Sequence, residues 1–221
     1  MQSSLYEFVP QETLKGRSFT DPSYSGRDLA DLQYMFGALC QLVCEPDKIP
    51  PAPRPLVLWL TEPDNRWQRV AICNDDGLRR GRDFTIVGFF GQKWPHVDPR
   101  PVDAVDDELI RELPEHRHVL SYSTMKRPDG DSCNLVVFDD PDGVRHWRTS
   151  ALHASAVRMS PAYYKSIRLH NAFCDGSMSL GGRLVMHRTK YYDFRSETPW
   201  RGVREFGGGS LTLPIAGAGA V

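Results

Sequence analysis

The order of apolar patterns between residues 83 and 170 constrains the fold more than any other feature of this chain. Strand-like stretches there alternate or are rich in β-branched and aromatic residues, whereas helix-like stretches carry apolar residues at spacings of three and four. Asp140-Pro141 is a typical helix start, because Asp caps the helix and Pro fits its first turn. The patterns predict strand, helix, strand, strand, helix and strand at 84–90, 102–113, 119–125, 134–138, 141–159 and 166–170.

This order predicts a ferredoxin-like, split βαβ domain of the α+β class over residues 83–192, with a further strand at 184–192. A sheet of this kind buries one face under its two helices and leaves the other face to be covered. A second copy of the chain is a common cover. We therefore expect a homodimer in which two such sheets form an α+β barrel.

Residues 1–80 are expected to form an extension made of a helix and a β-hairpin. The helix follows from apolar residues at helical spacing up to Cys44, and the hairpin from two apolar runs in 56–73 with a turn at 62–65. An alternative is that residues 5–73 form a degenerate ferredoxin-like half, which would make the chain an internal pseudo-dimer. Residues 193–221 form a C-terminal segment, and its Gly- and Ala-rich tail from Gly207 is expected to be flexible.

Composition argues against several classes of function. The 221 residues include 27 Lys and Arg against 28 Asp and Glu, so the net charge of −1 gives no electrostatic basis for binding nucleic acid. No apolar run is long enough to span a membrane, and the N-terminus does not resemble a secretory signal. The five cysteines contain no Cys-x-x-Cys, which favours a reduced, cytoplasmic setting. Phosphate-binding GxxxxGK[ST], strand-linked GxGxxG and GxSxG motifs are absent, so nucleotide cofactors and that hydrolase class are unsupported.

The segment 134–153 contains the pattern Trp147-x-x-Ser150-x-x-His153 after a strand and an acidic turn. In this it resembles the antibiotic-biosynthesis-monooxygenase type of dimeric α+β barrel. The resemblance implies a small oxidoreductase that needs no cofactor. Such an enzyme would act on an aromatic or apolar small molecule in a pocket between the sheet and its helices. Trp147 would shape that pocket and stack on the substrate.

Two further interpretations stay open. Haem-degrading members of the same superfamily also carry the helix tryptophan, with a haem-ligating histidine ten residues later. That position holds Val157 here, so a haem-binding enzyme would need His153 or His146 as the axial ligand. The other interpretation is a non-enzymatic, dimeric binding module in which Trp147 belongs to the core.

The candidate catalytic residues are His153, His146 and Tyr122. On one continuous helix the two histidines would lie on one face about 10.5 Å apart along the axis, too far to bind one metal ion but close enough to line one pocket. Imidazole titrates near neutral pH, so either histidine could transfer a proton, and Tyr122 could position the substrate. Three other residues are candidates for binding the substrate: Trp147, Phe89 and Arg168.

Other polar groups have simpler interpretations. His116-x-His118 has the spacing of metal ligands but lacks an evident third ligand, so no metal site is predicted. Cys40 and Cys44 lie one helical turn apart in an apolar stretch and are expected to be small buried hydrophobes. The acidic run 106–108 is expected to lie on the exposed surface of its helix.

Overall fold

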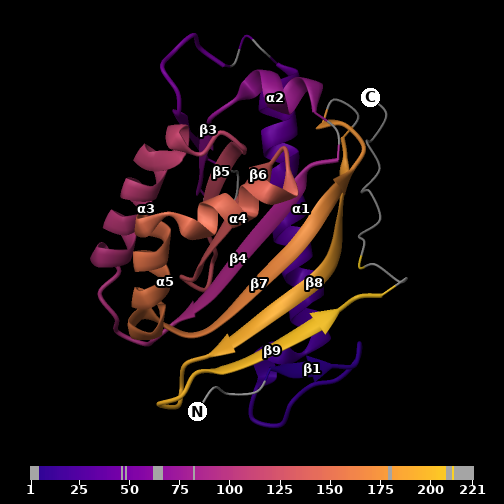
Figure 1. The fold of residues 1–221 in the computed structure, drawn as a ribbon, viewed down its shortest axis with the longest axis vertical. Coiled ribbons are helices and arrows are strands. Elements are labelled where there is room, and N and C mark those ends of the chain that lie inside the picture. The colour runs from indigo at the N-terminus through magenta and orange to yellow at the C-terminus, as the bar shows by residue number, and fades with distance from the viewer. Residues whose placement is uncertain are drawn as a thin grey trace.

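One sheet of nine strands runs through the described part of the chain in a computed structural model, which describes residues 5–45, 47, 49–61, 67–81, 83–178, 181–207 and 211 (Figure 1). The strands are β1 (Tyr6–Phe8), β2 (Leu56–Thr61), β3 (Trp67–Ile72), β4 (Thr85–Lys93), β5 (Val119–Lys126), β6 (Ser132–Phe138), β7 (Tyr164–Asp175), β8 (Arg183–Asp193) and β9 (Trp200–Glu205). Their order is β1-β9-β8-β7-β4-β6-β5-β3-β2. All neighbours are antiparallel except β1 and β9, which are parallel.

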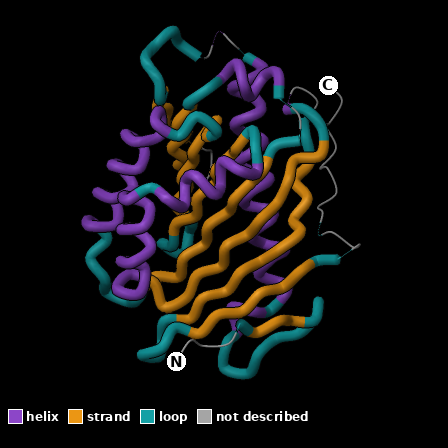
Figure 2. Tube along the Cα trace, in the orientation of Figure 1, coloured by secondary structure: helices purple, strands orange, loops and turns teal. Residues whose placement is uncertain are grey.

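Helices lie on both faces of this sheet (Figure 2). They are α1 (Pro22–Cys44), α2 (Asp75–Arg80), α3 (Arg100–Glu112), α4 (Pro141–Thr149) and α5 (Ala151–Tyr163), with short 3-10 turns η1 (Ser18–Thr20) and η3 (Leu113–Glu115). Figure 1 shows α1 crossing behind the sheet, while α3, α4 and α5 lie together on the other face.

Helix α1 packs along its own length against one face of the sheet. It begins where Asp21 accepts the backbone N–H of Ser23 and Pro22 occupies the first turn. Its apolar stripe, which includes the fully buried Leu32, packs on side chains of β4 such as Ile86. Cys40 lies in this core as expected, but Cys44 is exposed, because the helix ends there.

The other face has a smaller core beneath α3, α4 and α5. Ile110 of α3 and Trp147 of α4 pack there against Tyr122, Val136 and Phe138 of the sheet. These helices cover the middle of the sheet only. Figure 1 shows β8 and β9 in front of the molecule with none of the drawn helices over them.

The predicted ferredoxin-like, dimeric barrel fold is wrong, although the class is α+β. The strands β7, β4, β6 and β5 are neighbours in that order, but they are the middle of a nine-stranded mixed sheet rather than a complete one. β3 and β2 extend it at one side, and β8, β9 and β1 at the other. The face that was expected to need a second copy is covered by α1 of the same chain. Whether the chain is a homodimer stays a prediction.

The predicted helix 141–159 is two helices. Ser150 has an extended backbone (φ −57°, ψ 133°), which ends α4, and its hydroxyl accepts the backbone N–H of His153 to cap α5. The single stripe expected for His146 and His153 therefore does not exist. Helix α5 also continues past Pro161 to Tyr163.

Several expectations concern parts of the chain that are only partly described. The hairpin of β2 and β3 is present, but its turn at 62–65 lies outside the described residues, as does nearly all of the tail after Gly207. The proposed division into segments 1–80, 83–192 and 193–221 stays a prediction. Within the described ranges, none of the helices combines the length and apolar character needed to span a membrane.

Candidate functional site

A chain of polar side chains lies between α3 and the sheet. The hydroxyl of Tyr122 on β5 donates to Oδ1 of Asp106 on α3 at 2.5 Å, and the amide of Asn134 on β6 donates to that same hydroxyl. Thr124 donates to the other carboxylate oxygen of Asp106 at 3.3 Å. Arg69 on β3 forms an ion pair with the same oxygen, Oδ2 of Asp106. Tyr122 is thus held between an amide donor and a carboxylate acceptor.

Burial controls the electrostatics of this network. It raises the pKa of Asp106, and the hydrogen bond from Tyr122 and the charge of Arg69 only partly oppose the effect. Burial, with the nearby carboxylate of Asp106, raises the pKa of Tyr122 well above its usual value. Tyr122 therefore keeps its proton, and Asp106 is a stronger base than an exposed carboxylate.

Trp147 on α4 forms the apolar wall beside this network. Its ring is nearly parallel to that of Tyr122, with 7° between the planes and 6.0 Å between the centroids. Gly143, one turn earlier, lets α4 approach closely, because a Cβ there would lie 2.6 Å from Cβ of His118. The sequence therefore places the tryptophan ring directly against the sheet.

His153 lies at the start of α5, edge-on to Trp147 with ring centroids 5.9 Å apart. Burial, aided by the positive charge of Arg148, lowers the pKa of His153 to about 4. The imidazole is therefore neutral near pH 7 and is a weaker base than an exposed histidine. The serine that caps this helix, Ser150, also donates to Glu112 of α3 at 2.8 Å, which ties the two helices together.

The structure brings some of the predicted site residues together and separates others. Tyr122, Trp147 and His153 form one cluster. Phe89 is half-buried on the same face, edge-on to Tyr164. His146 is exposed and stacks with His118 at 6.1 Å, and His118 in turn pairs with Asp139.

Arg168 lies on the opposite face of the sheet. It is fully buried beneath α1 and pairs there with the buried Asp28, with Nε to Oδ2 at 2.5 Å. His170 bonds to the same carboxylate through Nε2 at 2.8 Å and to Thr189 through Nδ1. Arg168 therefore does not share a face with Trp147 and Phe89, and the sequence did not show that a helix covers the face on which it lies.

Sequence reasoning missed Asp106 and Asn134. Asp106 was expected on the surface within the acidic run 106–108, yet its side chain is only 16% exposed. Its position relative to Val102 and Leu109, four before and three after, puts it on the apolar stripe of α3. That spacing was the available signal.

Two hollows of the described surface lie elsewhere. One, of about 280 Å³, is on β8, β9 and β1, and the other, of about 350 Å³, is between α1 and the residues around Gly181. The described residues include no group of three His, Cys, Asp or Glu side chains that could hold a metal ion. Haem ligation by His153 or His146 stays a prediction.

Two comparisons with known proteins bear on the family of this chain. No family model matches the chain, and a search of the curated proteins finds nothing similar. Together with the nine-stranded sheet, this overturns the resemblance to the antibiotic-biosynthesis-monooxygenase type of barrel. The Trp147-x-x-Ser150-x-x-His153 pattern instead spans the junction of α4 and α5, where Ser150 is a helix cap.

Proposed function

We propose that this protein is an enzyme that removes a proton from a small aromatic molecule bound beside Trp147 and Tyr122. The observation that carries the proposal is the hydrogen-bonded chain from Asn134 through Tyr122 to Asp106, which ends in a carboxylate whose pKa is raised. Perturbed carboxylates with specific partners are typical of acid–base catalysis.

Each side chain has a role that follows from its position. Asp106 accepts the proton, because its raised pKa makes it a better base while Arg69 keeps it oriented. Tyr122 passes the proton along its short hydrogen bond. Trp147 supplies an aromatic ring beside Tyr122, and the neutral His153 lies edge-on to it.

The predicted oxidoreductase activity is consistent with this step. An electron-rich phenol that loses its proton becomes an anion that O₂ can oxidise, so proton removal and exclusion of water are what the protein must supply. Four residues beneath the helices keep partial exposure, which supports access of a substrate from solvent: Asp106, Asn134, Phe89 and His153.

The competing explanation is that the network only ties α3 to the sheet. In that case Tyr122→Phe would cost about 1 kcal/mol of stability through the lost hydrogen bond and change nothing else. An enzyme would lose activity far beyond that structural effect.

The test is oxygen uptake with a panel of electron-rich phenols. We expect at least one phenol to be consumed, and Tyr122→Phe and Asp106→Asn to lower kcat/KM by about 100-fold or more. Because Asp106 must be ionised to act, kcat/KM should fall as the pH drops through its raised pKa. Tyr163→Phe, at the end of α5, is the matched control and should leave the rate unchanged.

Two outcomes would overturn the proposal. One is that no phenol is consumed and none binds saturably by quenching of tryptophan fluorescence. The other is that Tyr122→Phe and Tyr163→Phe behave alike. Saturable binding without oxygen uptake would favour the binding-module interpretation over the enzyme.

A further inference from the structure

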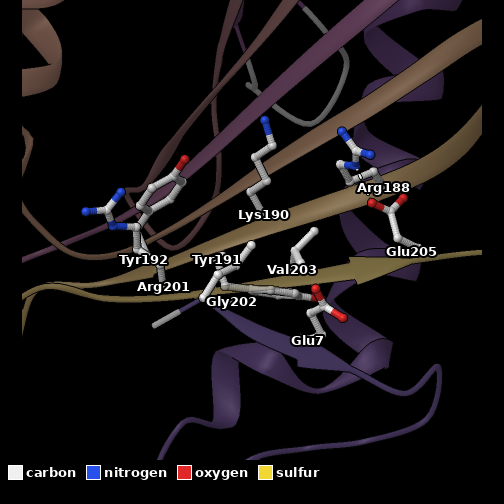
Figure 3. Close-up of a pocket in the computed structure, with 10 residues that line it drawn as sticks. Glu7, Arg188, Lys190, Tyr191, Tyr192, Arg201, Gly202, Val203 and Glu205 are labelled. Carbon is white, nitrogen blue, oxygen red and sulfur yellow. Dashed lines mark hydrogen bonds and ion pairs between the residues drawn. The ribbon is translucent and has the colours of Figure 1, made fainter. Parts of the chain in front are cut away.

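A groove of about 280 Å³ lies on the open part of the sheet, on the face opposite α1 (Figure 3). Side chains of β8 and β9 form most of its lining, with β1 at its rim. It shares no lining residue with the network around Tyr122, so it is a separate feature of the molecule.

Strand pairing fixes which side chains share this groove. Across β8 and β9, Arg188 lies opposite Glu205, Lys190 opposite Val203, and Tyr192 opposite Arg201. The alternating residues Thr189 and Tyr191 are fully buried on the α1 side. Figure 3 accordingly draws Arg188, Lys190, Tyr192 and Val203 rising from the same side of the two strands.

Positive charge in this groove is only partly balanced. Arg188 pairs with Glu205 at 2.5 Å. The side chains of Lys190 and Arg201, by contrast, form neither a hydrogen bond nor an ion pair with any described residue. Glu7 at the rim is the other carboxylate in the lining.

Arg148 at the end of α4 adds to this excess of positive charge. Burial, then the positive charges of Arg148 and Arg188, lower the pKa of Lys190. Arg148 also acts on Tyr192, which places it near the groove. In the lining itself three cations face two carboxylates, and the side chains of Lys190 and Arg201 are unpaired within the described residues, so the local field favours a ligand that carries about two negative charges.

We propose that this groove binds a small aromatic dianion of the aryl phosphate type. The phosphate would lie between Lys190 and Arg201, because a guanidinium fork and an ammonium are the side chains that best bind phosphate oxygens. The ring would lie on Tyr192 and Val203, which supply the aromatic and apolar surface. The inference rests on charge and register at this surface and is independent of the proposed enzyme.

Phenyl phosphate is the probe, titrated into the full chain at constant ionic strength, since salt screens exposed charges. We expect saturable amide shifts in two-dimensional NMR spectra, centred on residues 188–192 and 201–205. Lys190→Met and Arg201→Gln should each weaken binding at least about tenfold. Lys126→Met removes an exposed lysine at the end of β5, outside the groove, and should leave the affinity unchanged.

Two results of this titration would contradict binding of an aryl phosphate in the groove. Equal weakening by Lys190→Met and Lys126→Met would mean a general charge effect and would overturn the proposal. Saturation at the same residues by phenol with the same affinity would also overturn it, because the anion would then contribute nothing. Circular dichroism melting curves check that the variants fold, and the exposed Arg201 provides a second variant should Lys190→Met unfold.

Discussion

Replacing Arg168 by methionine is expected to lower the free energy of unfolding by about 3–5 kcal/mol, because it leaves a buried charge without its main partner. Asp28 is fully buried and receives two hydrogen bonds from Arg168, at 2.5 and 3.0 Å. Burial alone would raise the pKa of Asp28, but the hydrogen bond of His170 and the charge of Arg168 hold it below its usual value. The native carboxylate is therefore ionised and depends on these partners.

Urea denaturation followed by circular dichroism measures this loss. The matched control is Arg188→Met, which also removes an arginine from an ion pair on the same sheet. The Arg188–Glu205 pair is 42% and 53% exposed, so its removal should cost no more than about 1 kcal/mol. Similar losses of unfolding free energy in the two variants would contradict the expectation that the buried Arg168–Asp28 pair stabilises the fold more than an exposed ion pair does.

Acid is expected to destabilise the protein between about pH 6.5 and pH 4, through histidines that are buried in their neutral form. The ordinary histidine pKa is 6.5, whereas that of His153 is about 4 in the folded chain. In this window the unfolded chain binds a proton that the folded chain does not, so stability falls as the pH falls. The loss from His153 is complete below about pH 4 and amounts to at most about 3 kcal/mol.

The fully buried His170 acts in the same direction, and so, to a smaller extent, does the more exposed His187, because desolvation lowers the pKa of both. Unfolding free energies measured by urea from pH 7 to pH 4 should therefore decline, and His153→Gln should flatten part of the decline. His146→Gln is the control, since His146 is exposed. A decline of the same slope in His153→Gln and the wild type would contradict the assignment of this effect to His153.

Local pattern was enough to predict most helices and strands, but not how the strands assemble. The spacing of apolar residues along a segment indicates whether one face of it is buried. That spacing predicted α1, α3 and β4 to β8. It does not report which strands are neighbours. The pairing of β7 with β8 and the addition of β3 to β5 made a larger sheet than expected.

The candidate site was predictable in part for the same reason. Trp147 lies on the apolar stripe of α4, so its inward direction followed from spacing. Asp106 and Arg168 are charged residues inside the protein, which statistics of burial disfavour unless a partner is known. Their partners Arg69 and Asp28 are distant in sequence, and only the folded chain brings them together.

The parallel pairing of β1 with β9 has a consequence for folding kinetics. Tyr6 lies opposite Gly202, so β1 can pair with β9 only after almost the whole described chain has been synthesised. The cover that α1 provides likewise depends on β7 and β8. Contacts of such long sequence separation slow folding and keep apolar surface exposed during synthesis. We expect the apolar stripe of α1 to be the segment that chaperones bind while β7 to β9 are still emerging from the ribosome.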